Sequence, residues 1–327
     1  MKRASVPRLP EPDPERARDA EALAARAPLP AMQGNVSFGT AGWTDKTLLS
    51  SGAFYPKKSL RAAERLRFYA EHFRLVEVDA TYYTLVGRDT TGAWAEHTPE
   101  DFTFDVKAHP VLTGHPIEVA RLPLDLRAAL PAGRVYPDAL PSGVAREIEE
   151  RFVAALEPLS AAGKLGAVFL QYPPWFAATR GNARRIAAVR ERHPSLPFAV
   201  EFRHPSWLAP DRRERLTTLL GDNEMSYVVV DEPVTEHAGV PSDAWVTCSL
   251  LAVVRFHGHN VAGFGKRGAS VHERFDWLYT EGELRPWVPR IRALAREAKR
   301  VHVVFNNCVR NYAVLGAKGL SVLLEEA

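Results

Sequence analysis

The sequence predicts an α/β protein of the TIM-barrel-like (β/α)8 class, folded as a single domain with long loops over the C-terminal face of the barrel. The main observation is that short apolar runs alternate with segments of helical periodicity from position 36 onward. Eight such runs match a barrel, which takes roughly 250 residues and more with insertions. A doubly wound open sheet is the alternative. No Gly-x-Gly-x-x-Gly turn follows a run and no P-loop is present, so neither phosphate-binding motif supports that alternative.

Each predicted strand is a short run rich in β-branched or aromatic residues. The eight runs lie at 36–40, 75–80, 102–106, 167–171, 198–202, 227–230, 253–256 and 301–305. Helical periodicity is found at 59–73, 89–97, 142–163, 180–192, 211–222, 283–299 and 310–325. Every predicted strand is therefore followed by a helix except the sixth, for which no helix is assigned.

The first 33 residues differ in composition from the rest of the chain. They are rich in Pro, Ala, Arg and Glu and contain few large apolar residues. Positions 15–26 have helical potential, but the prolines on both sides favour an irregular chain. We therefore predict a disordered tail at 1–33 and a barrel domain at 34–327.

Composition limits the classes of protein to which the chain can belong. The 327 residues are 46% hydrophobic and 25% charged, with a net charge of +3, as is common in globular proteins. The two cysteines, Cys248 and Cys308, are too few for a disulfide framework. No apolar stretch is long enough to span a membrane and no signal peptide is recognisable, so we expect a cytoplasmic protein without a membrane partner. The small positive charge supports a nucleic-acid partner only weakly.

Three connections are longer than a barrel requires. They span 109–141, 234–251 and 258–282. Loops that follow barrel strands rise over the C-terminal face, where ligands bind. Long loops of this kind are usually lids or binding loops, and the alternative is decoration without a role in the site.

Polar side chains occur at the ends of most of the predicted strands. In chain order they are Glu77, Asp79, Lys107, Gln171, Glu201, Arg203, Asp231, Arg255, His257, Asn306 and Asn307. Side chains alternate between the two faces of a strand, and the intervening residues are mostly apolar and suited to packing against helices. We therefore expect the polar set to point into the barrel and to form one site at its C-terminal mouth. The alternative is a buried network of ion pairs that stabilises the barrel.

Nine short segments resemble, in the same order, motifs of the domain-of-unknown-function 72 family, also called YecE-like. They are Phe38-Gly39-Thr40-Ala41-Gly42-Trp43, Phe54-Tyr55-Pro56, Tyr69-Ala70-Glu71-His72-Phe73, Val76-Glu77-Val78-Asp79-Ala80-Thr81-Tyr82, Phe104-Asp105-Val106-Lys107-Ala108, Phe169-Leu170-Gln171-Tyr172-Pro173-Pro174, Glu201-Phe202-Arg203-His204-Pro205-Ser206-Trp207, Arg255-Phe256-His257-Gly258 and Phe305-Asn306-Asn307. The resemblance covers about residues 36–325. It implies a TIM-barrel-like fold and no established activity.

The chain departs from the usual motifs of that family at four positions. Ala41 replaces a serine, and Asp79 stands where the family usually has asparagine. Cys308 replaces an acid, and His259 stands where the strand-seven motif usually ends in arginine. Asp79 restores a carboxylate that Cys308 removes, or the four changes together mark an altered activity.

The polar set favours a hydrolase, lyase or isomerase that works by general acid–base chemistry. The catalytic candidates are Glu77, Glu201, Asp231 and His257, because positioned carboxylates and imidazoles transfer protons. Cationic side chains in the same set would hold an anionic or phosphorylated small molecule, which is the expected partner. The predicted substrate-binding residues are Trp43, Asp79, Tyr82, Lys107, Gln171, Arg203, His204, Trp207, Arg255, Asn306 and Asn307.

Two other functions stay open at this point. The four catalytic candidates are also a possible ligand set for a divalent metal such as Mg²⁺, Mn²⁺ or Zn²⁺, as in a metal-dependent phosphodiesterase or endonuclease. The neighbouring cations would compete for the same carboxylates. Aromatic residues at the strand ends, together with arginines, would instead suit a non-catalytic barrel that binds a nucleotide or a nucleic acid.

Overall fold

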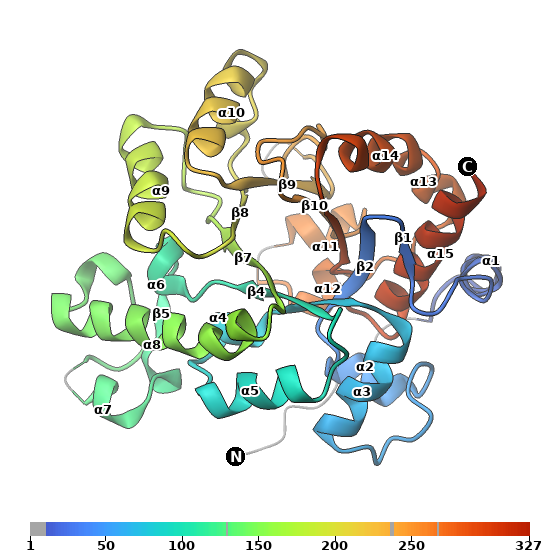
Figure 1. Ribbon diagram of the computed structural model, residues 1–327, viewed down its shortest axis with the longest axis horizontal. Helices are drawn as coiled ribbons and strands as arrows, with labels where there is room; N and C mark the ends of the chain where they lie inside the picture. The colour runs from blue at the N-terminus through green and yellow to red at the C-terminus, as the bar shows by residue number, and fades with distance from the viewer. Residues whose placement is uncertain (1–10, 129, 236–238, 267) are drawn as a thin grey trace. The chain divides into compact units, whose positions relative to one another are not determined.

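The computed structural model describes residues 11–128, 130–235, 239–266 and 268–327 (Figure 1). Its barrel strands are β2 (Val36–Ala41), β3 (Leu75–Val78), β4 (Thr103–Lys107), β7 (Leu165–Gln171), β8 (Phe198–Glu201), β9 (Ser226–Asp231), β10 (Ala252–Phe256) and β11 (Val301–Phe305). They pair in the order β2-β11-β10-β9-β8-β7-β4-β3, and β3 also pairs with β2. The fold is therefore the predicted TIM-barrel-like one, and all eight predicted strands are present.

Strand boundaries differ from the prediction by a few residues. Strand β3 ends at Val78, two residues before its predicted end, and Asp79 stands at the N-cap position of the short helix α4 (Ala80–Tyr83). Asp79 therefore lies outside the strand, and the alternation that predicted it on the same face as Glu77 does not apply to it. A short strand that was not predicted, β1 (Met32–Gln33), pairs antiparallel with β2.

Helices follow the strands as the periodicity indicated. They are α2 (Lys46–Ser51), α3 (Ala62–His72), α5 (Arg88–Glu96), α8 (Ser142–Ala161), α9 (Arg180–Arg192), α10 (Arg213–Asp222), α13 (Glu281–Leu284), α14 (Trp287–Glu297) and α15 (Tyr312–Glu326). The single helix predicted at 283–299 is divided into α13 and α14, and Pro286 stands at the N-cap of α14. Between β9 and β10 the described residues contain no helix.

Two of the long connections contain regular structure. The 109–141 connection holds α6 (Pro110–Thr113), α7 (Leu124–Arg127) and an antiparallel pair of short strands, β5 (Ile117–Glu118) and β6 (Arg134–Val135). The 258–282 connection holds α11 (Val261–Gly265) and α12 (Val271–Arg274). Positions 236–238 and 267 of the later connections lie outside the described residues.

The predicted disordered tail is partly helical. Helix α1 (Pro14–Ala24) begins after Asp13, whose carboxylate accepts hydrogen bonds from two backbone N–H groups of the first turn. Its apolar side packs against α15, and Leu23 is buried. Pro14 occupies the first helical position, where a missing N–H costs nothing. Residues 1–10 of the predicted tail lie outside the described residues.

The contacts divide the chain into two compact units. The first unit comprises the residues up to Val76 and from Val228 onward, and the second comprises Glu77–Tyr227. Within the first unit, Phe256 of β10 pairs in register with Asp231 of β9 and with Phe305 of β11. Within the second unit, Gln171 of β7 pairs in register with Glu201 of β8. The C-terminal ends of neighbouring strands are therefore aligned inside each unit.

None of the helices among the described residues combines the length and apolar character that crossing a membrane requires.

Candidate functional site

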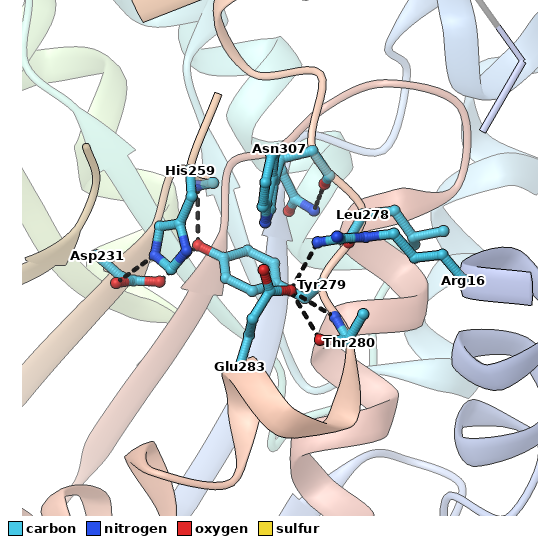
Figure 2. Close-up of polar contacts among 10 residues, drawn as sticks. Arg16, Asp231, His259, Leu278, Tyr279, Thr280, Glu283 and Asn307 are labelled. Atoms are coloured by element: carbon cyan, nitrogen blue, oxygen red, sulfur yellow. Dashed lines mark hydrogen bonds and ion pairs between the residues drawn. The ribbon is translucent and has the colours of Figure 1, made fainter. Parts of the chain in front are cut away.

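The first unit holds a carboxylate–imidazole pair at the C-terminal ends of two strands. Asp231 is the last residue of β9, and His259 follows β10 closely in the chain. Asp231 Oδ1 lies 2.9 Å from His259 Nε2 (Figure 2). The Asp231 side chain is 9% exposed and that of His259 is 36% exposed. A nearly buried acid therefore holds one nitrogen of a half-exposed imidazole.

The second oxygen of Asp231 is also engaged. Tyr279 Oη donates a hydrogen bond of 2.7 Å to Asp231 Oδ2, and the backbone N–H of Gly258 donates one of 2.8 Å to Tyr279 Oη. Burial, followed by the charge of Asp231, raises the pKa of Tyr279 well above its ordinary value. Tyr279 therefore remains a neutral donor. The carboxylate of Asp231 is fixed from both sides.

Gly258 sets the direction of the backbone between His257 and His259. Its φ is +88°, which favours glycine. A Cβ at this position would also lie only 2.4 Å from Cβ of Trp277. The motif glycine is therefore required on two independent grounds, and it allows the chain to turn so that His259 reaches Asp231.

The environment of His259 favours its charged form. The hydrogen bond from its ring to Asp231 raises the pKa of His259; burial opposes this effect, and the charge of Asp231 adds to it. Because an ionised carboxylate only accepts hydrogen bonds, Nε2 must carry a proton. Nδ1 is therefore the ring nitrogen of His259 that does not take part in the contact with Asp231.

Other predicted residues of the first unit are enclosed by protein. His257 is fully buried and its Nδ1 lies 3.0 Å from Nδ2 of Asn306. Asn307 is also fully buried, and its Nδ2 donates a hydrogen bond of 2.8 Å to the carbonyl of Trp277. Arg255 is only 1% exposed. Their burial fits the alternative in which the deeper polar residues stabilise the barrel.

Two further side chains of the first unit, Trp43 and Arg16, make contacts of their own. Trp43 is buried, and its carbonyl accepts a hydrogen bond of 2.5 Å from Tyr55 Oη. Arg16 of α1 lies over the ring of Trp277, 4.4 Å from the centroid, and forms an ion pair of 2.7 Å with Glu283. The N-terminal helix thus contributes a cation to the segment that carries Tyr279 (Figure 2).

The second unit brings together several of the predicted anion-binding residues. Arg203 Nη2 lies 2.5 Å from Glu201 Oε1, with the Glu201 side chain fully buried and that of Arg203 13% exposed. Lys107 Nζ lies 4.6 Å from the ring centroid of Tyr82. Burial, followed by the positive charges of Lys107 and Arg203, lowers the pKa of His115 to about 4. Both cations therefore act on the same neutral imidazole.

His204 and Trp207, predicted to bind substrate, make local contacts in the turn after β8. His204 Nδ1 lies 2.8 Å from Ser206 Oγ and accepts a hydrogen bond from the backbone N–H of Ser206. Trp207 is buried, and its Nε1 donates a hydrogen bond of 2.6 Å to the carbonyl of Phe176. These contacts give both side chains a role in holding the turn.

The remaining predicted residues of the second unit lie at the ends of β3 and β7. Glu77 is fully buried, whereas Asp79 and Gln171 are half-buried. Among all described residues, no group of three or more His, Cys, Asp or Glu side chains is arranged to hold a metal ion.

Sequence reasoning placed Asp231 in the site but missed His259, Tyr279 and His115. His259 had a usable signal, because it directly follows the Arg255-Phe256-His257-Gly258 motif at the predicted end of a strand, where ligands bind in a barrel. Tyr279 had no such signal, since it lies twenty residues beyond His259 in a connection without periodicity. Its contact with Asp231 depends on how that connection folds.

Comparisons with known proteins identify the family. Residues 37–327 match the family described as a protein of unknown function, DUF72. The UPF0759 protein YunF of Bacillus subtilis (strain 168) is 29% identical over 295 residues, which cover 89% of this chain and 95% of that protein. The UPF0759 protein YecE of Escherichia coli (strain K12) is 29% identical over 193 residues, which cover 57% of this chain and 59% of that protein.

Crystal structures of two relatives support the same assignment. A DUF72 family protein from Thermotoga maritima has a TM-score of 0.70 and 30% identity, over 89% of this chain and 99% of that one. A DUF72 family protein from Enterococcus faecalis has a TM-score of 0.73 and 25% identity, over 89% of this chain and 95% of that one. The chain is a member of the DUF72 family, as its sequence motifs predicted.

Proposed function

We propose that this DUF72 protein is an enzyme that acts on an anionic substrate by general acid–base chemistry, with His259 as the group that transfers the proton. The observation that carries the proposal is the pairing of His259 with the nearly buried Asp231 at the C-terminal ends of β9 and β10. Active sites of TIM-barrel enzymes lie at these ends of the strands.

Among the described residues, His272 and His193 also lie beside carboxylates, and a comparison with them favours His259. His272 Nε2 lies 3.0 Å from Asp45 Oδ2, and His193 Nε2 lies 2.6 Å from Glu149 Oε1. Their side chains are 17% and 14% exposed, against 36% for His259. His259 is therefore the most accessible imidazole of the three, and it is the one held by an acid at the end of a barrel strand.

In this proposal the two nitrogens of His259 have different tasks. Nε2 donates to Asp231, which fixes the ring and stabilises its positive charge when it is protonated. Nδ1 would accept a proton from a substrate when the ring is neutral and donate one to a leaving group when the ring is charged. A positioned acid or base of this kind contributes about 10²–10⁴-fold to a rate. Hydrolases, lyases and isomerases all use such a group.

The second unit, taken by itself, carries two cations that are suited to hold an anion. Lys107 and Arg203 lie at the ends of β4 and β8, and their charges act together on His115. Arg203 is oriented by its ion pair with Glu201, and an oriented guanidinium is suited to bind a carboxylate or phosphate. We propose Lys107 and Arg203 as anion-binding residues of the second unit, and Glu201 as the residue that positions Arg203.

The proposal is tested by incubating the protein with a small-molecule extract of bacterial cells and following the metabolites by mass spectrometry. The native protein should deplete at least one anionic metabolite and form a matching product. His259→Gln should slow this conversion by about 10²–10⁴-fold. His193→Gln removes a histidine of similar pairing and should behave as the native protein. Identical metabolite profiles with native protein and with His259→Gln would contradict the proposal.

A further inference from the structure

The 109–141 connection forms a small folded layer of its own. β5 and β6 pair within it, and the backbone N–H of Val119 donates a hydrogen bond of 2.9 Å to the carbonyl of Gly133. Apolar side chains from the connection form a separate cluster with Ile148 of α8. A segment with its own strands and core can hold the walls of a binding site in place.

This layer and helix α4 enclose a pocket of about 280 Å³ in the second unit. The aromatic part of its lining includes Tyr82, Tyr83 and His115, together with Trp175 from the turn after β7. The ring centroids of Tyr82 and His115 are 5.4 Å apart, and those of His115 and Trp175 are 5.9 Å apart. Trp175 is 56% exposed, so its indole ring is accessible to a ligand.

The polar part of the lining carries an excess of positive charge. The charged residues of the lining are two arginines, Arg121 and Arg134, and one acid, Glu118. Arg134 Nε lies 3.4 Å from a Glu118 carboxylate oxygen, and the Arg121 guanidinium lies 5.0 Å from the ring centroid of Tyr83. Because the pKa of His115 is lowered to about 4, this imidazole is neutral near pH 7 and adds a hydrogen-bonding group without adding charge.

We propose that this pocket binds a nucleoside monophosphate, with Trp175 stacking on the base and Arg121 contacting the phosphate. Flat aromatic walls favour a planar ring, and guanidinium groups favour a phosphate over a neutral ligand. The pocket volume limits the ligand to a single small molecule. This binding site does not depend on the proposed acid–base activity, since binding alone would occupy it.

The test is isothermal titration calorimetry of the full chain with AMP, GMP, CMP and UMP. At least one should bind with a stoichiometry of one, and adenosine or inorganic phosphate alone should bind more weakly. Trp175→Ala and Arg121→Ala should each weaken the binding about tenfold or more. Tyr136→Ala and Arg146→Ala are matched controls, because both residues are exposed and neither lines the pocket. Both controls should bind the nucleotide as the native protein does.

Several results would overturn the proposal. One is the absence of binding by all four nucleotides up to millimolar concentration. Another is binding that neither Trp175→Ala nor Arg121→Ala changes. Inorganic phosphate that binds as tightly as the nucleotides would reduce the pocket to a simple anion site. An eight-nucleotide oligo-dT that binds at least tenfold more tightly than UMP would assign the pocket to single-stranded nucleic acid instead.

Discussion

His259 and Gly258 show how much of the proposed chemistry depends on two adjacent residues. Gly258 adopts a positive φ that favours glycine, and it has no side chain that would clash with Trp277. That conformation places the imidazole of His259 against one carboxylate oxygen of Asp231. The backbone N–H of Gly258 donates a hydrogen bond to the hydroxyl of Tyr279, which in turn donates one to the other oxygen. The consequence is an imidazole whose pKa is raised while a third of its surface remains exposed.

The raised pKa of His259 predicts a pH-dependent contribution to stability. A group whose folded pKa lies above its unfolded value stabilises the protein fully below the unfolded value, near 6.5 for histidine. That contribution is lost as the pH rises through the higher folded pKa. The difference in unfolding free energy between native protein and His259→Gln should therefore be larger at pH 5.5 than at pH 8.5. Urea unfolding at the two pH values measures it, and a difference that grows with pH would contradict the assignment.

Substitution of Gly258 by alanine should destabilise the protein more than alanine at a comparable open position. Gly34 also has a positive φ, +57°, but a Cβ there would meet no atom within 4 Å. Gly34→Ala should cost about 1–2 kcal/mol from the backbone conformation alone. Gly258→Ala adds the clash with Trp277 and should cost more. Equal unfolding free energies for the two variants would contradict this prediction, because they would mean that the Trp277 side chain moves aside without lowering stability.

Helix α1 is the element whose behaviour the sequence predicted least well. Its prolines and charges suggested an irregular tail, and its few apolar residues suggested little burial. In the structure, Leu23 packs against α15, where the absence of a side chain on Gly319 leaves space for it. Arg16 of the same helix pairs with Glu283. Each of these contacts joins α1 to a part of the chain more than 250 positions away, which no local pattern reveals.

Docking of α1 can be tested through Leu23. Leu23→Ala removes a buried side chain and should lower the unfolding free energy by about 2–4 kcal/mol. Leu29→Ala is the matched control, because Leu29 is 59% exposed and its truncation should change little. Denaturant unfolding of both variants decides the point. Equal stability of the two would mean that α1 does not stabilise the first unit.

For the whole molecule, three histidines predict loss of stability in acid. The pKa values of His72, His109 and His115 are each lowered to about 4, with burial as the main cause. Between about pH 6.5 and pH 4 the unfolded chain then binds more protons than the folded one, so stability falls as the pH falls. Unfolding free energies measured across this range should decline, and His109→Gln should reduce the slope. An unchanged slope in this variant would contradict the low pKa of His109.

The overall fold was predictable because alternating strands and helices leave a periodic signal along the chain. All eight barrel strands were found in this way, and Asp231, Glu201 and Arg203 were correctly placed at strand ends. What periodicity could not supply were contacts made by long connections. Tyr279 reaches Asp231 from such a connection, and the pocket at Trp175 is closed by another. Their positions follow from tertiary packing rather than from local sequence.

The most direct test of the proposed acid–base group is a nitrogen-15 NMR titration of the His259 imidazole in the native protein and in Asp231→Asn. In the native protein we predict a pKa above 6.5 and a neutral form protonated at Nε2, with Nδ1 free to exchange a proton. Asp231→Asn should lower that pKa. A native pKa at or below 6.5, or a neutral form protonated at Nδ1, would contradict the assignment of His259 as the proton-transferring residue.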